Sequence, residues 1–432
     1  MLRHRWLGWV VGMCLGASAL AQTGTPAPVI DIASWWVSPG EQASLDVIRR
    51  HAQAQGLQWR QRVVAGSGTS RFGDVLQRWV AQGQAPMASQ VIGYDIHAWA
   101  QQGQLALLDD VARAQEWDAV VPLGIQHLSK YQGHWVAAPI NAHSTNWLWV
   151  NAALFRQLGA AAPDTWDDLV RLLAQARAAG MVPLAIGPDA WEHTLLFESV
   201  AAGAGGAEFY RRAFLELEPE ALQGNDVLAE VFRRMRVLRS YAVRLPGTRT
   251  WDAATDQVRQ GQALLQVQGS WVDGEFAAHR LQPGRDYECL RFPDTQGMFL
   301  FNADQYMFFQ EALHGVAGEQ VRQTFARVLM DLEMQTELNI ATGAIPARVD
   351  VSRERFNRCG QQAVSDMRRA NLQRTLMGSI AMGNANPPEV KNAMYAVISA
   401  HFLGRISDAQ AVQRLTAVIA AARPRQAVAA GR

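Results

Sequence analysis

Two adjacent tryptophans and a nearby carboxylate stand in the stretch DIASWWVSPGEQ, residues 31–42. Neighbouring side chains of a β-strand point to opposite faces, so Trp35 and Trp36 cannot both fill a core on one side. An indole offers a large flat apolar face on which another ring can stack, and the carboxylate of Glu41 accepts hydrogen bonds from hydroxyl groups. We therefore expect one indole to pack in the core while the other, together with Glu41, faces a ligand.

A second group of polar side chains lies in PINAHSTNWLWVN, residues 139–151. Asn141, His143 and Asn146 can bind hydroxyls, and they stand between two apolar, strand-like runs. Two interpretations remain open: these residues contact a ligand, or they satisfy one another where the chain crosses between lobes. Trp271, which follows a Gly-Ser turn, likewise either faces a ligand or packs in the core.

Patterns that would indicate catalysis are weak. The turn VAGSGTSR lacks the Gly-Lys-Ser/Thr ending of a phosphate-binding loop, so we expect Gly66 to let the backbone approach a ligand or a helix. Glu192 and His193 could form an acid–base pair, but a capped helix start with a tryptophan directed at a cleft fits AWEHTLLFE better. We expect a binding protein rather than an enzyme, without a cofactor.

Histidine and cysteine spacing gives no indication of a metal site, because the ten histidines form no HxH or HExxH pattern and no paired CxxC occurs. Three cysteines are present, and one of them, Cys14, lies in the N-terminal apolar run. For Cys289 and Cys359, two interpretations remain: one disulfide, or two free and distant thiols.

The first residues have the pattern of a secretory signal. A basic start at residues 3–5 precedes a short apolar run, and Ala19-Leu20-Ala21 is a small-x-small cleavage site. We expect residues 1–21 to be a signal peptide and the mature chain to be exported to the periplasm. Because Cys14 lies inside the apolar run, a lipid anchor is disfavoured.

Length and charge limit the classes of protein to be considered. A mature chain of about 410 residues exceeds one usual hydrophobic core, which predicts two lobes. The 40 basic and 39 acidic residues are balanced and no basic run occurs, so we expect no nucleic-acid partner. Fifteen tryptophans are a high count, typical of a site that stacks on rings.

The elements that must position these side chains alternate between strand and helix, with short Gly-rich turns, which predicts an α/β fold. Residues from about 153 to 280 are expected to be mostly helical, and strand-like runs return at DYECLRFP and GMFLFNADQYMFFQ. We expect one lobe from residues 27–140 plus about 300–345. The other, helix-rich lobe is expected from about 141–299 plus about 346–422.

Two longer stretches, GHWVAAPINAHSTNWLWVNAALFRQLGAAAPDTWDDL and GQALLQVQGSW, resemble family 1 extracellular solute-binding proteins, the receptors of ABC importers. The resemblance covers the mature chain and is strongest to the periplasmic glucose-binding branch. It implies two α/β lobes joined by a hinge, with the ligand held in the cleft between them. It also implies ligand capture and delivery to an inner-membrane permease by a monomer, rather than catalysis.

The resemblance also implies roles for individual residues. It matches a disulfide to Cys289 and Cys359, and it matches further family positions to Trp35, Trp36, Glu41, Trp147, Trp149, Asn302 and Asp304. We expect Trp35 or Trp36 to stack on the ring, Glu41 and Asp304 to accept hydrogen bonds, and Asn302 to donate and accept. From the second lobe, Trp271 closes the other wall.

Three positions depart from the glucose-binding branch. Where the branch has two lysines and a histidine, this chain has Ile92, Thr342 and Met382. Each lost hydrogen bond to a charged group is worth ~1.5–3 kcal/mol, so we expect weak binding of glucose and a changed ligand. A neutral monosaccharide-like sugar, or a less hydroxylated or more apolar relative, fits best. The alternatives are a receptor of the same fold that reports to a membrane sensor kinase, and a secreted carbohydrate-active enzyme.

Overall fold

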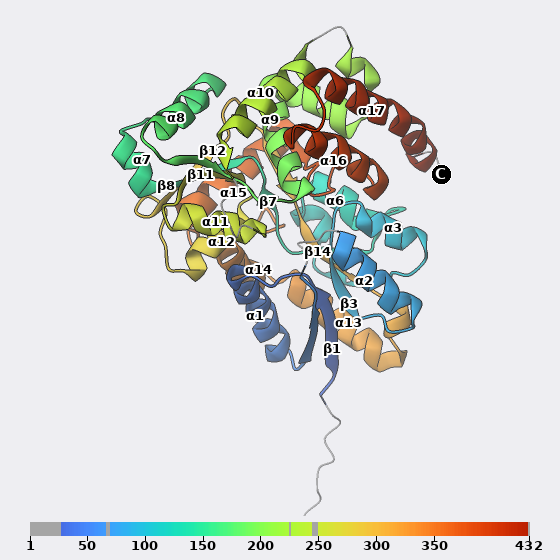
Figure 1. Ribbon diagram of the computed structural model, residues 1–432. Coiled ribbons are helices and arrows are strands. Elements are labelled where there is room, and N and C mark those ends of the chain that lie inside the picture. Colours follow the sequence, from blue (N-terminus) through green and yellow to red (C-terminus); the bar gives the residue numbers. More distant parts are fainter. Residues whose placement is uncertain (1–26, 66–69, 224–225, 244–248, 431–432) are drawn as a thin grey trace, which may run out of the picture.

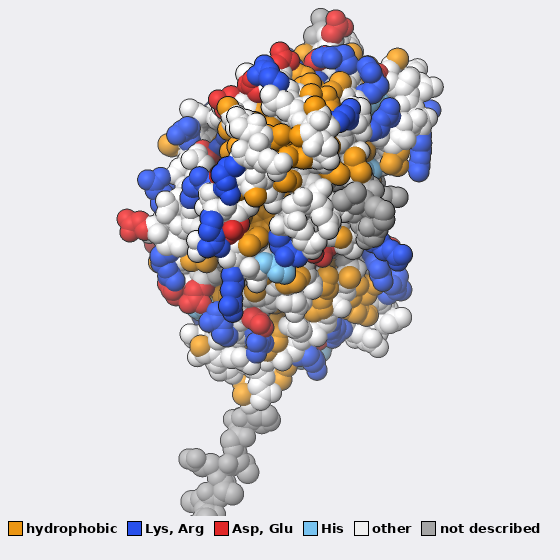
Figure 2. All heavy atoms as spheres, turned by 60° about the vertical axis from the view of Figure 1, so that its left-hand side comes forward, with side chains coloured by type: hydrophobic (Ala, Val, Ile, Leu, Met, Phe, Trp, Pro, Cys, Tyr) orange, Lys and Arg blue, Asp and Glu red, His pale blue; other side chains and the backbone are white. Residues whose placement is uncertain are grey.

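The computed structural model describes residues 27–65, 70–223, 226–243 and 249–430 (Figure 1). The predicted signal peptide and Gly66 lie outside the described residues. Among the helices described, none is long and apolar enough to cross a membrane. Figure 2 shows basic and acidic side chains interspersed over one face, as expected from the balanced charge.

The first sheet has five strands in the order β2-β1-β3-β14-β6. These strands are β1 (Val29–Ser34), β2 (Gln58–Val63), β3 (Ala88–Ile92), β14 (Asp304–Phe308) and β6 (Ala137–Pro139). β1 is parallel to β2 and β3, while β14 runs antiparallel to β3 and β6. β3, β14 and β6 are buried along their whole length, and β3 and β14 carry buried polar side chains, among them Gln90 and Asp304.

Helices from two separate parts of the chain accompany this sheet, as the blue and orange ribbons of Figure 1 show. α1 (Pro39–Ala54) packs against α14 (Leu332–Thr342) and α13 (Gly315–Leu329). Shorter elements complete this part of the chain: α2 (Ser70–Ala81), α3 (Asp95–Gln101), α4 (Asp109–Ala114), α5 (Trp117–Val120), α6 (Leu123–Ser129), β4 (Lys130–Tyr131) and β5 (His134–Trp135).

The second sheet also has five strands, in the order β10-β9-β11-β8-β12. These strands are β10 (Ala242–Val243), β9 (Val182–Ala185), β11 (Ala263–Gln268), β8 (Trp147–Asn151) and β12 (Tyr287–Arg291). Three of them come from the segment that was expected to be mostly helical, so that expectation understated the strand content. Short apolar runs do not distinguish a buried strand from a buried helix by periodicity.

Long helices surround the second sheet. α9 (Ala190–Tyr210) and α10 (Val227–Tyr241) pack against α16 (Pro388–Phe402) and α17 (Asp408–Ala430), so the C-terminal helices join this half of the molecule. The remaining helices of this half are α7 (Ala152–Leu158), α8 (Trp166–Ala178), α11 (Trp251–Arg259), α12 (Trp271–Ala278) and α15 (Arg358–Gln373).

A third sheet of three strands lies where the chain passes between the two halves. β7 (His143–Ser144) connects the first sheet to the second, and β13 (Phe299–Asn302) returns; they pair antiparallel, with β15 (Leu376–Gly378) beside β13. The buried carboxylate of Glu198 accepts hydrogen bonds from Thr145, Ser379 and the amide of Ala381. This carboxylate therefore ties α9 to the crossing segments.

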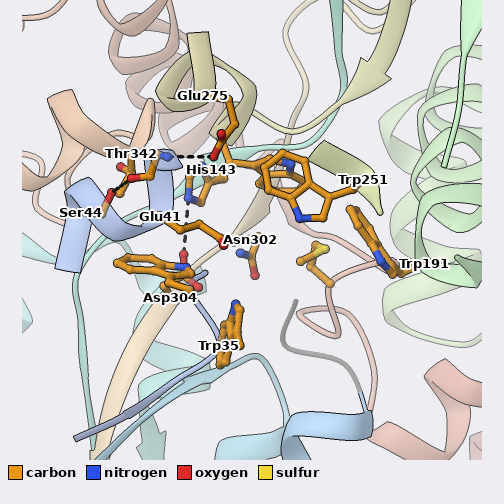
Figure 3. Close-up of a pocket in the computed structure, with 14 residues that line it drawn as sticks. Trp35, Glu41, Ser44, His143, Trp191, Trp251, Glu275, Asn302, Asp304 and Thr342 are labelled. Carbon is orange, nitrogen blue, oxygen red and sulfur yellow. Dashed lines mark hydrogen bonds and ion pairs between the residues drawn. The ribbon is translucent and has the colours of Figure 1, made fainter. Parts of the chain in front are cut away.

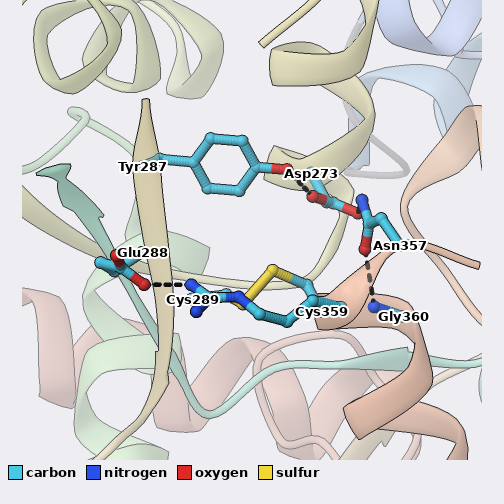
Figure 4. The surroundings of a disulfide bond; sticks show 8 residues. Asp273, Tyr287, Glu288, Cys289, Asn357, Cys359 and Gly360 are labelled. Carbon is cyan, nitrogen blue, oxygen red and sulfur yellow. Dashed lines mark hydrogen bonds and ion pairs between the residues drawn. A yellow bond between two sulfur atoms is a disulfide. The ribbon is translucent and has the colours of Figure 1, made fainter. Parts of the chain in front are cut away.

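A disulfide joins Cys289 on β12 to Cys359 on α15 (Figure 4). Near it, Asp273 accepts hydrogen bonds from Tyr287 and Asn357. The disulfide was predicted against the alternative of two free thiols, and this prediction is confirmed. It closes a chain segment that contains β13, β14, α13 and α14.

Candidate functional site

A cavity of about 540 Å³ lies at the carboxyl ends of β1, β11 and β13 (Figure 3). The residues predicted from the sequence that line it are Trp35, Trp36, Glu41, His143, Trp271, Asn302, Asp304, Thr342 and Met382. The fold therefore gathers side chains more than 340 positions apart in the sequence around one space.

Both tryptophans of the Trp-Trp pair line the cavity, contrary to the expectation that they would divide between core and ligand. The alternation rule does not apply, because β1 ends at Ser34 and the pair follows the strand. Trp35 is also edge-on to Phe72 of α2, with ring centroids 5.3 Å apart. It therefore serves the core and the cavity wall together.

Glu41 is held by the start of α1. Ser38 caps this helix, and the Glu41 carboxylate completes the capping box by accepting hydrogen bonds from the amides of Val37 at 2.8 Å and Ser38 at 2.9 Å. The Ser38 hydroxyl also donates to Glu275 of α12, and so does the amide of Gly40 at 3.2 Å. One serine thus holds two glutamates of the cavity.

Asp304 is fixed by side chains from the crossing segment. Asn141 donates to its Oδ2 at 2.8 Å and accepts from its amide at 2.8 Å, while Gln90 donates to Oδ1 at 3.1 Å. His143 Nε2 lies 3.4 Å from Oδ2. Asn141 therefore satisfies a neighbour in the crossing, as one interpretation predicted. His143 lines the cavity, and its contact with a ligand stays a prediction.

Three indoles form another wall. Trp271 begins α12, and its ring lies edge-on to those of Trp191 and Trp251, with centroids 6.1 and 6.4 Å away. Trp191 and Trp251 stand in the first turns of α9 and α11. A Cβ on Gly269 would lie 2.2 Å from the Trp271 ring, so only glycine lets this ring rest over the backbone.

Ile92 departs from the expectation, because it is not among the residues that line the cavity. It pairs with Asp304 in the register of β3 with β14 and is 4% exposed, which makes it core. Trp147 and Trp149 are also buried in the core, stacked on each other with centroids 6.0 Å apart. Gly66 belongs to the residues that the structure does not describe.

Five lining residues were not among the predicted site residues: Gly40, Ser44, Trp191, Trp251 and Glu275. The helix-start pattern did point Trp191 at a cleft, and Asp189 with Glu192 indeed forms the capping box of α9. No local pattern predicted Glu275 as a site residue, because its hydrogen-bond partner Ser38 is 237 positions away in the sequence. Only the packing of α12 on α1 brings them together.

Burial shapes the electrostatics of the cavity. Burial, opposed by hydrogen bonds from Ser38 and Val37 and assisted by the nearby Glu275 charge, raises the pKa of Glu41 from 4.5 to about 7. Burial also raises the pKa of Glu275. No lysine or arginine is among the described residues of the lining, and the described part of the chain contains no cluster suited to a metal ion.

Residues 63–311 match the sequence model of a family described as bacterial extracellular solute-binding proteins. A protein of Rhizobium meliloti (strain 1021) named "Probable sugar-binding periplasmic protein" is 40% identical over 410 residues, which cover 95% of this chain and 98% of the relative. The chain belongs to the bacterial extracellular solute-binding protein family. A Brucella suis relative of the same name is 38% identical over 417 residues, 95% of this chain and 98% of that protein.

Solved structures agree with the solute-binding fold. A chitin oligosaccharide binding protein superposes with a TM-score of 0.73 at 18% identity, covering 92% of this chain and 100% of that one. The raffinose complex of RafE gives a TM-score of 0.70 at 16% identity, covering 91% and 99%. The predicted two-lobed α/β fold and the predicted family are confirmed.

Proposed function

We propose that the protein is a periplasmic receptor that captures a monosaccharide-like sugar in this cavity and delivers it to an inner-membrane ABC permease. The family comprises binding proteins rather than enzymes. The observation that carries the proposal is that indole rings and polar side chains line the same cavity. The chain is also closely similar to proteins named sugar-binding. A sugar ring has C–H faces for the indoles and hydroxyls for the polar groups.

The sugar would lie against Trp35, Trp36 and Trp271. Asp304 and Glu41 would accept hydrogen bonds from hydroxyls, while Asn302 would donate, since its Oδ1 already accepts from Asn384. His143, Thr342 and Met382 would complete the contacts on the remaining sides. The first sheet with residues 27–140 and about 300–345, and the second with the rest of the described chain, would act as the two lobes.

Closure would occur about the crossing strands β7 and β13. The hydrogen bond from Ser38 to Glu275 and that from the Tyr94 amide to the Gly383 carbonyl, 2.9 Å long, hold the walls together. A ligand touching both walls would shift the population toward the closed form, which the permease would read. We propose that the receptor acts as a monomer.

A thermal-shift screen of the purified mature protein against aldoses, amino sugars, disaccharides and sugar acids tests the proposal. A ligand at 100 times its dissociation constant should add about 2.7 kcal/mol to the free energy of unfolding. Absence of a shift with every carbohydrate would overturn the sugar assignment.

A further inference from the structure

Acidic side chains outnumber basic ones in the described lining of the cavity. Glu41, Glu275 and Asp304 line it, and the single basic side chain of the described lining is His143, which already lies 3.4 Å from Asp304. The two lysines of the chain are occupied elsewhere: Lys130 pairs with Asp118, and Lys391 lies 3.9 Å from Asp95. Charges removed from water require partners, and in this cavity the protein supplies too few.

Two of the carboxylates retain acceptor capacity. Glu41 uses Oε2 for the capping box, and Glu275 uses Oε1 for Ser38 and Gly40. Within the described residues, neither Oε1 of Glu41 nor Oε2 of Glu275 has a hydrogen-bond or ion-pair partner. Because Ser38 contacts both side chains and the Glu275 charge acts on Glu41, the two carboxyl groups are neighbours at the start of α1.

Helix capping explains the presence of only some of these acidic side chains. Glu41 and Glu192 complete the capping boxes of α1 and α9, where each helix start carries roughly half a positive charge. Glu275 lies in the second turn of α12, and Asp252 raises its pKa further. Neither this glutamate nor Asp304, which lies on a strand, is explained by capping its own helix.

Among the described residues, no cation lies over an indole of the cavity. In the described part of the chain, guanidinium or ammonium groups lie over the rings of Trp79, Trp135, Trp147, Trp166 and Tyr241, all outside the cavity. Five indoles line the cavity. Indole is the aromatic ring that attracts a cation most strongly.

We propose that the captured sugar carries a protonated amine, so that the ligand class is a cationic amino sugar rather than a neutral one. This inference rests on the proposed function. The ammonium would lie between Glu41 and Glu275, where its three N–H donors meet the two free carboxylate oxygens. The ring would stack on the indoles, and Asp304 with Asn302 would bind hydroxyls.

Ligand pairs that differ in charge test the inference. We expect glucosamine, galactosamine or mannosamine to bind at least about tenfold more tightly than glucose and N-acetylglucosamine at about pH 6.5, because hydrogen bonds to charged groups are the stronger ones. Calorimetry in buffers of different ionisation enthalpy should show proton release on amino-sugar binding, since a cationic ligand favours the ionised form of Glu41, which burial and the Glu275 charge disfavour.

Matched variants locate the effect. Glu41→Gln keeps a capping-box residue while removing the charge, so it should lower the preference for the amine about tenfold and abolish the proton release. Glu275→Gln should also lower the preference. Glu192→Gln is the control, because Glu192 has the same capping role and a pKa raised to about 8 but does not line the cavity. It should change the affinity less than about twofold.

The outcomes separate the two proposals. Equal or tighter binding of a neutral sugar would overturn the amine and leave the sugar receptor standing. Binding of choline without any sugar would overturn the sugar receptor and retain recognition of a cation. No binding by any of these compounds would overturn both.

Discussion

At the scale of single residues, the cavity is assembled from side chains that each have a structural task as well. Glu41 caps a helix, Trp35 packs on Phe72, and Asp304 is anchored by Asn141. Such double use pre-orients the side chains before a ligand arrives, which lowers the entropy cost of binding. Substitutions at these positions must therefore be assayed for stability as well as affinity.

Trp36→Ala separates the two roles of the Trp-Trp pair. We expect the affinity for the sugar found in the screen to fall at least about tenfold, because a stacking surface is lost. The control is Trp149→Ala in the core, which should lower the free energy of unfolding by about 3–5 kcal/mol. Titration calorimetry measures the affinity, and urea unfolding measures the stability. If Trp36→Ala lowers the free energy of unfolding as much as Trp149→Ala does and keeps the affinity, Trp36 is a core residue.

Glu198 predicts a pH dependence of stability. Burial raises its pKa from 4.5 to about 7, so the folded protein binds more protons than the unfolded chain between these values. Its contribution is present in full below about pH 4.5 and is lost as the pH rises through 7, up to about 3 kcal/mol.

Glu198→Gln should therefore flatten the fall of unfolding free energy between pH 5 and 8, measured by urea titration at each pH. Glu354→Gln, at an exposed position, should leave the slope as in the wild type. Equal slopes in the wild type and Glu198→Gln would show that Glu198 ionises normally when folded.

At the scale of elements, the cavity depends on a close approach of α1, α12 and α14. A Cβ on Gly274 would lie 2.7 Å from the carbonyl oxygens of Ala341 and Thr342. These are backbone atoms that cannot move aside singly, so glycine is what allows α12 to rest on the end of α14. That contact places Trp271 and Glu275 opposite α1.

Gly274→Ala should displace α12 and lower both ligand affinity and unfolding free energy, the latter by about 1–3 kcal/mol. Gly73→Ala is the matched control, because its Cβ would meet nothing within 4 Å on helix α2, where alanine is favoured by about 0.5–1 kcal/mol. Unchanged affinity and melting temperature in Gly274→Ala would contradict this account of the contact.

At the scale of the whole molecule, the chain passes between the halves at β7, at β13 and again before α15. The disulfide closes the segment that makes the last two passages. Cys289 and Cys359 are 70 positions apart. The segment between them leaves the second sheet, contributes β14 to the first and returns to α15. The disulfide thus limits how far the unfolded chain can separate its two halves.

Replacing both cysteines, Cys289→Ser with Cys359→Ser, should lower the free energy of unfolding by up to about 4 kcal/mol, from the entropy of a loop of this length. Denaturant unfolding measures the loss. A reductant should destabilise the wild type and leave the double variant unchanged; a wild type insensitive to reduction would contradict the prediction.

Local patterns were enough for much of this protein. The capped start of α9 and several apolar strand runs depend on residues a few positions apart, so the order of residues in the sequence is enough to predict them. The polar segment around His143 and the family resemblance together indicated nine of the lining residues, and the cysteine count with the resemblance indicated the disulfide.

The tertiary structure alone decided which distant side chains share one space. Ile92 does not line the cavity, because pairing of β3 with β14 buries it. Trp251 and Glu275 do line it, because the packing of α11 and α12 places them there. The tertiary structure also decided the charge of the cavity, because no local pattern reports whether a lysine or arginine stands across from a glutamate. The physical reason is that burial and Coulomb interactions depend on distance in space, which chain order does not specify.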